Sequence, residues 1–291
     1  MQRRATGRDL QLTVRMACVS LLLLGAYTAI GVALLALYEA EPSWGLYVTI
    51  IALAIACTVV AHYLSATEVL LRTAGVRLDA SAPATATLER RVARLAALAD
   101  IPAPRVGIAD SDDLNAFTVG VRQKRAVVVV TSGLYNRLEE LELDAVLAHE
   151  LAHIANRDAA VMSLASVPRS IGATIAGAGS DAGFYLWFFI WPLGLIPYGF
   201  GTLLTLAMSR YREYAADRGS ALITGRPETL MSALTKLGDG AAIASGDLRA
   251  VGALCIIGAD PRRSELLMDH PPLAKRLAAL GEIARDLGQP A

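Results

Sequence analysis

Long apolar runs alternate with stretches of mixed polarity along the chain. The first apolar run extends from about Met16 to Tyr38, and the second extends from Trp44 to about Ser65. Each run is long enough to cross a hydrocarbon core of about 30 Å, and only a short turn separates them. We therefore predict a transmembrane hairpin over residues 16–66, preceded by an N-terminal segment over residues 1–15.

A cleaved secretory signal is the alternative for the first run, because arginines precede it. However, the run is longer than the apolar part of a typical signal, and no clear cleavage site follows it. Arginines also follow the second run, whereas the turn between the runs carries Glu39 and Glu41. The positive-inside rule then predicts that the N-terminus and the region after residue 66 face the cytoplasm.

Residues 67–158 show the pattern of a globular domain. Apolar side chains recur at helical spacing from Leu88 to Leu98. A longer helix is predicted from about Leu141 to beyond Asp158, with an apolar stripe along it. Alternating or β-branched residues predict three short strands with a turn before the last one. These strands and the turn are Arg105–Ala109, Asn115–Val121, Ala126–Thr131 and Gln123–Arg125.

The second half of the chain begins with a third apolar region, residues 159–208. A natural turn at Gly179-Ser180-Asp181 divides it. It is expected to form either two further spans or a hydrophobic hairpin packed on the membrane. Residues 209–291 are then predicted to form helices joined by loops, with one helix starting near Pro272.

The composition agrees with a membrane protein, because 54% of the 291 residues are hydrophobic and only 19% are charged. The formal net charge is zero, so nothing indicates a nucleic-acid partner. The three cysteines lie far apart, which argues against a disulfide framework or a cysteine zinc site. Only four histidines are present, so their positions are informative.

The strongest chemical signal is the segment His149-Glu150-Leu151-Ala152-His153. Two histidines four residues apart on a helix lie on one face, where they can bind one metal ion. Neutral imidazole is a common zinc ligand. Glu150 sits beside such a metal, where it can deprotonate a zinc-bound water for attack on a peptide carbonyl. We therefore predict a zinc peptidase site with one Zn²⁺ per chain; the alternative is a chance pairing of helix-surface residues.

A catalytic zinc site needs a third protein ligand and an open position. No histidine follows shortly after His153, and the better candidate is Glu213, four residues before Asp217. The two carboxylates share one helix face, and a second carboxylate suits imidazole N–H groups that need an acceptor. A solvated acidic helix edge is the alternative for this pair.

A shared ion would also restrict the membrane topology. If His153 and Glu213 bind one ion, they lie on the same side of the membrane. The region between them then crosses the membrane twice or not at all, so a single crossing is excluded. Four spans in total is the preferred prediction, and two spans with a membrane-associated hairpin is the alternative.

Several motifs follow one another in a fixed order. They are Asn115–Gly120, His149–His153, Asn156–Asp158, Arg212–Asp217, and His270–Pro272 with Arg276. Together they resemble the HtpX and CAAX-prenyl-protease family of membrane zinc metallopeptidases, over nearly the whole chain after the first span. The resemblance implies an α+β, mainly helical membrane protein, in which transmembrane helices accompany a gluzincin-like zinc metallopeptidase domain with a small β-sheet.

The resemblance also implies roles for individual residues. Glu213 is the expected third zinc ligand, and Asp217 is the expected partner of a ligating histidine. Asn115, Ala116 and Phe117 resemble the active-site edge strand of the family, which would hold a substrate by main-chain hydrogen bonds. An ordinary edge strand is the alternative for this segment.

The last motif resembles the family's pair of residues that stabilise the oxyanion of the tetrahedral intermediate. His270 and Arg276 are the members of this pair, and a helix cap with a surface arginine is the alternative. His62 is expected to lie at the membrane interface. Asn156 and Asp158 are left out of the predicted site, because they also suit the polar face of their helix.

The function implied by the resemblance is a zinc endopeptidase of the bacterial cytoplasmic membrane, with its N-terminus and catalytic domain in the cytoplasm. It would cleave membrane or misfolded proteins in stress-related quality control. Its partners would be protein or peptide substrates and the lipid bilayer, without nucleic acid; no oligomeric state is predicted. The alternatives are processing of lipidated CAAX-type peptides, and a catalytically silent zinc-binding scaffold. The scaffold would require a missing essential residue, and none is missing.

Overall fold

The computed structural model describes residues 76–77, 83–120, 122–180, 184–240 and 270–288, and the single positions 25, 49 and 53. These residues form two compact units. The first unit comprises the described residues between 67 and 160 and between 209 and 291, and the second comprises those between 161 and 208 and the single positions 25, 49 and 53. All predicted site residues belong to the first unit. The predicted hairpin over residues 16–66 lies outside the described residues, apart from the three single positions.

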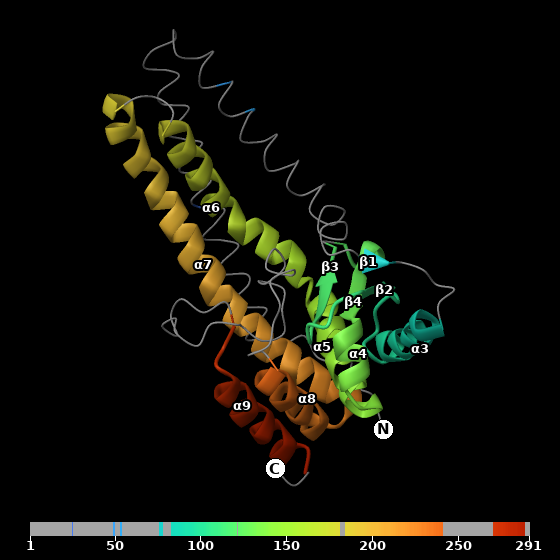
Figure 1. Cartoon of the computed structure of the whole chain (residues 1–291). Coiled ribbons are helices and arrows are strands. Elements are labelled where there is room, and N and C mark those ends of the chain that lie inside the picture. The colour runs from blue at the N-terminus through green and yellow to red at the C-terminus, as the bar shows by residue number, and fades with distance from the viewer. Residues whose placement is uncertain are drawn as a thin grey trace. The chain divides into compact units, whose positions relative to one another are not determined.

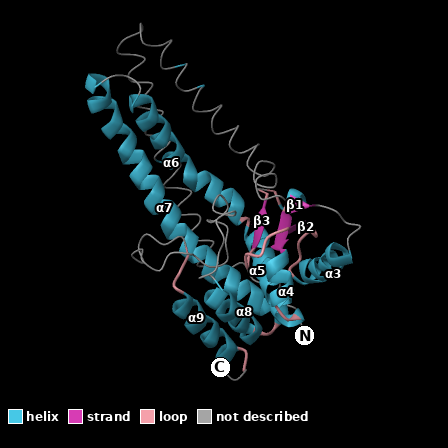
Figure 2. Cartoon of the chain, viewed as in Figure 1, coloured by secondary structure: helices cyan, strands magenta, loops and turns pink. Residues whose placement is uncertain are grey.

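A four-stranded sheet with the order β1-β2-β4-β3 forms one layer of the first unit (Figures 1 and 2). Its strands are β1 (Val76–Arg77), β2 (Arg105–Ala109), β3 (Ala116–Val119) and β4 (Val127–Thr131). Strand β4 is parallel to β2 and antiparallel to β3, where Thr118 lies opposite Val128. Strand β3 is therefore the last strand at one side of the described sheet.

Both faces of the sheet are buried, which explains the uninterrupted β-branched run of β4. Val128 and Val130 point into the larger core, and Val127 and Val129 point into a smaller cluster with Phe117 on the opposite face. Successive side chains of a strand alternate between faces, so a strand covered on both sides needs apolar residues throughout. The three predicted strands are confirmed, and β1 is an addition that its two residues did not reveal.

The end of β3 is set by Gly120, which has a φ of +117°. A Cβ at this position would lie 2.9 Å from the Cα of Ala126, so only glycine fits without a shift of the backbone. The following turn is a short 3-10 helix, η2 (Gln123–Arg125). Gln123 donates from Nε2 to the carbonyl oxygen of Ile154 at 3.0 Å. The turn is thereby tied to the end of the helix that carries the histidine motif.

That helix is α5 (Glu140–Asn156). It begins with a capping box, in which Glu139 and Glu142 each accept a hydrogen bond from the other's backbone N–H. It ends at Arg157, whose left-handed conformation (φ 59°, ψ 35°) stops the helical hydrogen-bond pattern. The prediction that this helix continues beyond Asp158 is therefore wrong, because α6 (Asp158–Ser180) begins there as a separate helix.

The remaining helices surround α5 in the first unit. Helix α3 (Pro83–Leu98) packs against β2 and α5, and α4 (Ser132–Arg137) follows β4 directly. Helix α8 (Pro227–Gly240) packs against α5 on one side and α9 (Leu273–Asp286) on the other. Helix α7 (Phe184–Thr224) belongs to this unit from Ser209 onward. Helix α5 thus contacts α3, α8, β3 and β4, and 12 of its 17 residues are buried, including His149 and Glu150. Figure 1 shows its place beside the sheet.

Two buried carboxylates hold α5 between its neighbours. Asp144 accepts a hydrogen bond from Arg91 of α3 at 3.0 Å, and Arg94 contacts its other oxygen. Glu142 accepts hydrogen bonds from Ser232 at 2.7 Å and Lys236 at 2.8 Å, both on α8. Burial alone would raise the pKa of Glu142, but these two donors lower it. The position of α5 is thus fixed by ion pairs as well as by the apolar core.

In the second unit, α6 and the first part of α7 approach each other closely. A Cβ at Gly172 would collide with the backbone of Tyr198, and one at Gly201 would collide with the backbone of Arg169. The guanidinium carbon of Arg169 lies 5.7 Å from the ring centre of Tyr198. The choice between two spans and a membrane-associated hairpin for residues 159–208 stays a prediction. Of the helices in the described part of the chain, none has the length and apolarity of a membrane span.

Candidate metal centre

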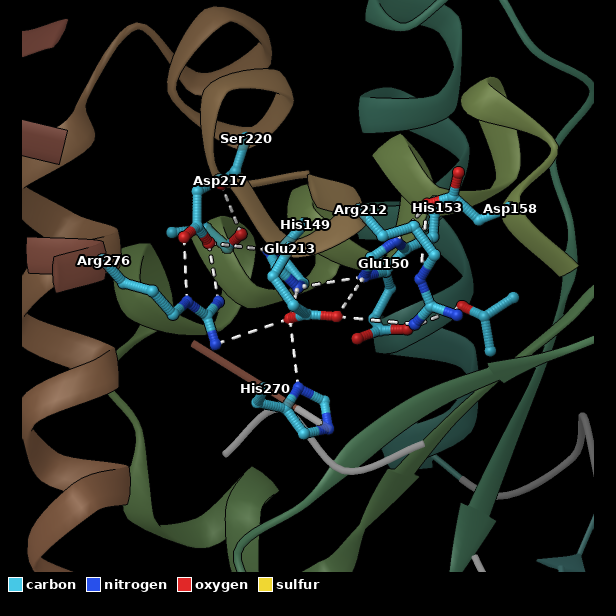
Figure 3. Close-up of polar contacts among 12 residues, drawn as sticks. His149, Glu150, His153, Asp158, Arg212, Glu213, Asp217, Ser220, His270 and Arg276 are labelled. Carbon is cyan, nitrogen blue, oxygen red and sulfur yellow. Dashed lines mark hydrogen bonds and ion pairs between the residues drawn. The ribbon is translucent and has the colours of Figure 1, made fainter. Parts of the chain in front are cut away.

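His149 and His153 face the same point from one side of α5 (Figure 3). Their Nε2 atoms lie 3.1 Å apart, and their rings meet edge to face. Two nitrogen ligands of one tetrahedral zinc ion are about 3.3 Å apart, given Zn–N bonds of about 2.0–2.1 Å. The spacing of four residues therefore brings the two Nε2 atoms close enough to bind one metal ion, as the sequence predicts.

Glu213 of α7 lies opposite the two histidines and is 1% exposed. Its Oε2 is 3.5 Å from His149 Nε2, and its Oε1 is 3.7 Å from His153 Nε2. Oε2 is buried and accepts no hydrogen bond from the described residues. A buried carboxylate oxygen that accepts no hydrogen bond raises the free energy of the folded protein unless a cation lies next to it. Glu213 is thus placed where the sequence predicts a third ligand.

The approach of α7 to α5 depends on small residues that the sequence analysis did not single out. A Cβ at Gly219 would lie 2.5 Å from the Cβ of Ala152, so the two helices are in close contact there. One residue further on, Ser220 donates from its hydroxyl to the carbonyl oxygen of Ala145 at 2.7 Å. These contacts set the distance between the helices and hence the reach of Glu213.

The second nitrogen of each histidine ring faces a buried aspartate. His149 Nδ1 lies 3.0 Å from Asp217 Oδ1, and His153 Nδ1 lies 2.6 Å from Asp158 Oδ2. A carboxylate at Nδ1 orients the ring and leaves Nε2 for a metal. Asp217 lies where it is predicted. Asp158 was left out of the predicted site, and the structure places it against His153 because α5 ends at Arg157.

Arg276 of α9 is 1% exposed and lies at the centre of this network. It donates from Nε and Nη2 to both oxygens of Asp217, at 2.8 Å and 2.6 Å. Its Nη1 lies 3.5 Å from Glu213 Oε2. The alternative of a surface arginine is therefore excluded, and the direct partner of Arg276 is a carboxylate of the site.

His270 precedes α9 and is 4% exposed. Its Nδ1 lies 3.5 Å from Glu213 Oε2, on the side of the site away from α5 (Figure 3). Neither of its ring nitrogens has a hydrogen-bond partner among the described residues. The structure thus brings His270 and Arg276 to the site together, and both lie 3.5 Å from the same oxygen of Glu213.

Glu150 lies beside the two histidines and is held from the edge strand. Thr118 of β3 donates from its hydroxyl to Glu150 Oε2 at 2.8 Å. The predicted substrate-binding residues Asn115, Ala116 and Phe117 come just before it and are buried. Thr118 is therefore the residue of the β3 segment that contacts the catalytic motif, and the sequence analysis did not select it.

The electrostatics of the site separate the roles of its acids. Burial raises the pKa of Glu150 above its ordinary value, and the hydrogen bond from Thr118 offsets this only in part. Burial would also raise the pKa of Glu213, but His149 and His270 hold it well below its ordinary value. Burial would lower the pKa of His149, but Asp217 and Glu213 outweigh burial and raise it to about 9. Glu150 is thus suited to exchange protons, whereas Glu213 stays ionised.

The charges of the buried side chains favour a divalent cation at this point. Among the described residues, four carboxylates and two guanidinium groups line the site, which leaves two negative charges when His149, His153 and His270 are neutral. The carboxylates are Glu150, Asp158, Glu213 and Asp217, and the guanidinium groups are Arg212 and Arg276. One divalent cation balances this charge, so the residues fit a metal ion of the zinc type.

A helix with two histidines and a glutamate, closed by a buried glutamate from a second helix, defines a metallopeptidase site. Residues 83–284 match the family model described as Peptidase family M48. The chain belongs to this family, and it is a metalloendopeptidase. The resemblance that the ordered motifs indicate is thereby confirmed.

Similar proteins match over nearly the whole chain. One is "Protease HtpX homolog 1" of Streptomyces coelicolor, which is 39% identical over 97% of this chain and 95% of that protein. Another is "Protease HtpX homolog 2" of Methanosarcina mazei, which is 35% identical over 98% of this chain and 99% of that protein. Among solved structures, the crystal structure of S. mikatae Ste24p matches with a TM-score of 0.48 and 19% identity. It covers 94% of this chain and 66% of that chain.

Proposed function

We propose that this protein is a zinc-dependent endopeptidase of the membrane that cleaves membrane or misfolded proteins. The observation that carries the proposal is the convergence of His149, His153 and Glu213, with Glu150 beside them. One Zn²⁺ per chain would be held by the two Nε2 atoms and the Glu213 carboxylate, with one position open for water or substrate.

The choice of Glu213 rather than Glu150 as the third ligand rests on two contacts. Glu150 does form a potential ligand group with His149 and His153, with atoms within 4.8 Å of one another. However, Glu150 is engaged by the Thr118 hydroxyl and has a raised pKa, whereas a metal ligand must be ionised. Each Glu213 oxygen lies close to one histidine nitrogen, and its pKa is low.

The proposed chemistry is peptide hydrolysis. A bound zinc ion supplies the Lewis acidity that polarises the peptide carbonyl and makes water a nucleophile at neutral pH. Glu150 accepts the proton of the attacking water and passes it to the leaving nitrogen, which its raised pKa favours. Thr118 holds one oxygen of Glu150 and thereby restricts the orientation of the base.

Substrate binding is assigned to β3, the last strand of the described sheet, and to His270. An extended peptide would pair with the main chain of the segment Asn115–Phe117 and its continuation at Thr118. His270 would donate a hydrogen bond to the oxyanion from Nε2, which has no hydrogen-bond partner among the described residues. Arg276 would add a positive charge near the oxyanion, although two of its three nitrogens are engaged by Asp217.

The membrane location is proposed from the sequence. The apolar runs over residues 16–66 and 159–208 support it, and the arginines around the first hairpin favour a cytoplasmic catalytic domain. The similarity to proteins named as proteases, over nearly their whole length, supports proteolysis. Membrane or misfolded proteins as substrates are proposed from the resemblance of the ordered motifs to the family. Processing of lipidated CAAX-type peptides is the alternative, and a direct assay separates the two.

The test uses the full chain purified in detergent. We expect one zinc ion per chain, and cleavage of casein or self-cleavage by the wild type but not by Glu150→Gln. Bound zinc together with equal cleavage by both proteins would overturn the mechanism. A second assay compares an unfolded membrane protein with a prenylated CAAX peptide, and preferential cleavage of the prenylated peptide would favour the alternative substrate class.

A further inference from the structure

We propose that Arg212 and Asp158 position the second histidine and the glutamate of the zinc site, as Arg276 and Asp217 do for the first histidine. Arg212 and Asp158 are called the second arm, and Arg276 and Asp217 the first arm. Both arms end on the same carboxylate, Glu213 (Figure 3). This inference rests on the proposed zinc site and assigns to it two positioning residues that the sequence analysis had left out.

The first arm is a continuous chain of contacts from α9 to α5. Arg276 donates to both oxygens of Asp217, and Asp217 Oδ1 lies 3.0 Å from His149 Nδ1. The Nε2 of the same histidine lies 3.5 Å from Glu213 Oε2. Arg276 Nη1 closes the chain, because it lies 3.5 Å from that same oxygen.

The second arm repeats this chain with different residues. Arg212 Nε lies 3.7 Å from Asp158 Oδ2, and this oxygen lies 2.6 Å from His153 Nδ1. His153 Nε2 lies 3.7 Å from Glu213 Oε1. Arg212 Nη2 closes the chain, because it lies 3.4 Å from that oxygen. Glu213 Oε1 is therefore shared by His153 and Arg212, and Oε2 is shared by His149 and Arg276, with His270 Nδ1 as a third neighbour at 3.5 Å.

The correspondence arises from unrelated parts of the sequence. In the first arm, the aspartate lies on α7 and the arginine on α9. In the second arm, Arg212 precedes Glu213 on α7, and Asp158 begins α6 directly after the end of α5. Asp158 and Arg212 are 2% and 12% exposed at their side chains, which is uncommon for charged residues unless they are paired.

The physical consequence concerns the charge near Glu213. Without Arg212, the carboxylates of Asp158 and Glu213 would be buried near each other with one cation fewer. Asp158 would then no longer be held in place by a cation, and His153 would lose the fixed acceptor that orients its ring. Arginine suits this place because its planar fork reaches two carboxylates at once, which a lysine ammonium does less well.

The contact distances also predict how much zinc affinity is lost when each residue of the second arm is replaced. The contacts of Arg276 with Asp217 are hydrogen bonds of 2.6–2.8 Å, whereas Arg212 makes a longer hydrogen bond of 3.4 Å to Glu213 and an ion pair of 3.7 Å with Asp158. Loss of a residue that supports a metal ligand typically weakens metal affinity by about 10–100-fold. We expect Arg212→Met to lie near the lower end of this range, and Asp158→Asn to lie near the upper end.

The test measures zinc affinity of the full chain in detergent by competition with a chelator, together with thermal unfolding of the zinc-free protein. The variants are Arg212→Met, Arg212→Lys and Asp158→Asn. The matched control is Arg91→Met, because Arg91 is also largely buried and also pairs with two carboxylates, Glu140 and Asp144, away from the site. A purely structural role would lower the stability of the variant and of the control alike.

We expect Arg212→Met to bind zinc about 10-fold more weakly, with Arg212→Lys intermediate and Arg91→Met equal to the wild type. In the double variant with Asp158→Asn, the two losses should be less than additive, because Arg212 acts partly through Asp158. Wild-type affinity in both Arg212 variants would overturn the inference while the proposed zinc site stands. Absence of zinc binding in the wild type would overturn the proposed site and the inference with it.

Discussion

Arg276 donates hydrogen bonds to both carboxylate oxygens of Asp217, from Nε at 2.8 Å and from Nη2 at 2.6 Å. Asp217 in turn contacts His149. Arg276, which lies 59 residues after Asp217 in the sequence, therefore orients a proposed zinc ligand through that carboxylate. Burial would lower the pKa of Arg276, but the neighbouring carboxylates outweigh it, so the guanidinium stays charged. The main contact of Arg276 is therefore with Asp217, the carboxylate that orients His149.

Replacement of Arg276 by Met leaves Asp217 buried beside Glu213 without its cation. We expect the zinc-free protein to lose about 3–5 kcal/mol of unfolding free energy, the usual cost of removing one partner of a buried ion pair. Urea unfolding in detergent, followed by tryptophan fluorescence, measures this loss. The double variant with Asp217→Asn should be less destabilised, because no charge is left unpaired. Equal losses in both variants would contradict the assignment.

Replacement of Glu150 by Gln removes the proposed base without removing a proposed ligand. We expect zinc binding to be kept and kcat to fall by about 10²–10⁴-fold, the usual contribution of a general acid–base group. Peptidase assays with zinc-loaded protein and metal analysis of the same samples provide the measurement. A glutamine variant that loses its zinc would mean that Glu150 is a ligand, as its proximity to both histidines also allows.

Replacement of Glu213 by Ala removes the third ligand and the common end of both arms. We expect zinc occupancy to fall well below one per chain, with a loss of activity that excess zinc restores only in part. Metal analysis after dialysis measures the occupancy. Glu150→Gln serves as the control, because it removes a buried carboxylate from the same site. Full zinc retention in Glu213→Ala would remove this residue from the ligand set.

Zinc binding should depend steeply on pH. Asp217 and Glu213 raise the pKa of His149 to about 9 in the zinc-free protein, above an ordinary value of 6.5. The ring must lose a proton before Nε2 binds the metal, so apparent zinc affinity should rise about tenfold per pH unit up to pH 9 and then level off. Chelator competition at several pH values between 6 and 9.5, spaced by about half a unit, measures this slope.

The same pKa shift affects the stability of the zinc-free protein in the opposite direction. A raised pKa in the folded state contributes stability that is fully present below pH 6.5 and is lost as the pH rises through about 9. Asp217→Asn should lower the pKa of His149 and flatten both pH profiles. Profiles that are unchanged in this variant would show that Asp217 is not the cause of the shift.

The close contact between Gly219 and Ala152 should control zinc affinity from outside the ligand set. A methyl group at position 219 would lie 2.5 Å from the Cβ of Ala152 and would push α7 away from α5. We expect Gly219→Ala to lose about 1–3 kcal/mol of stability through overpacking and to bind zinc more weakly. The double variant with Ala152→Gly removes the collision and should recover zinc affinity, as chelator competition would reveal. No recovery would mean that the helix separation is set elsewhere.

Much of the site could be predicted because its signals are local. His149 and His153 share a helix face through their spacing of four residues, and Glu213 and Asp217 do the same on α7. The apolar and β-branched patterns likewise predicted β2, β3 and β4, since burial on both sides of a strand is visible in the sequence. These predictions need only a helix or strand period, which the chain carries within a few residues.

Asp158 and Thr118 were missed because their contacts arise from a helix end and from helix–strand packing, which the helical or strand periodicity of the sequence does not reveal. Asp158 appeared to continue the polar face of α5, but Arg157 ends that helix in a left-handed conformation and turns Asp158 toward His153. Thr118 was passed over in favour of the three residues before it, since its contact with Glu150 exists only when α5 packs beneath β3. Neither contact has a signal in the residues that flank it.

The sequence by itself determined the class of chemistry, because two histidines and a glutamate at helical spacing create a metal-binding face wherever the helix lies. Only the tertiary structure decided which carboxylate meets which ring nitrogen and which arginine meets which carboxylate. That outcome depends on the close contact of Gly219 with Ala152, and on the docking of α9, which carries Arg276 to Asp217. Buried charges select their partners by distance in space, and that distance is set by helix packing.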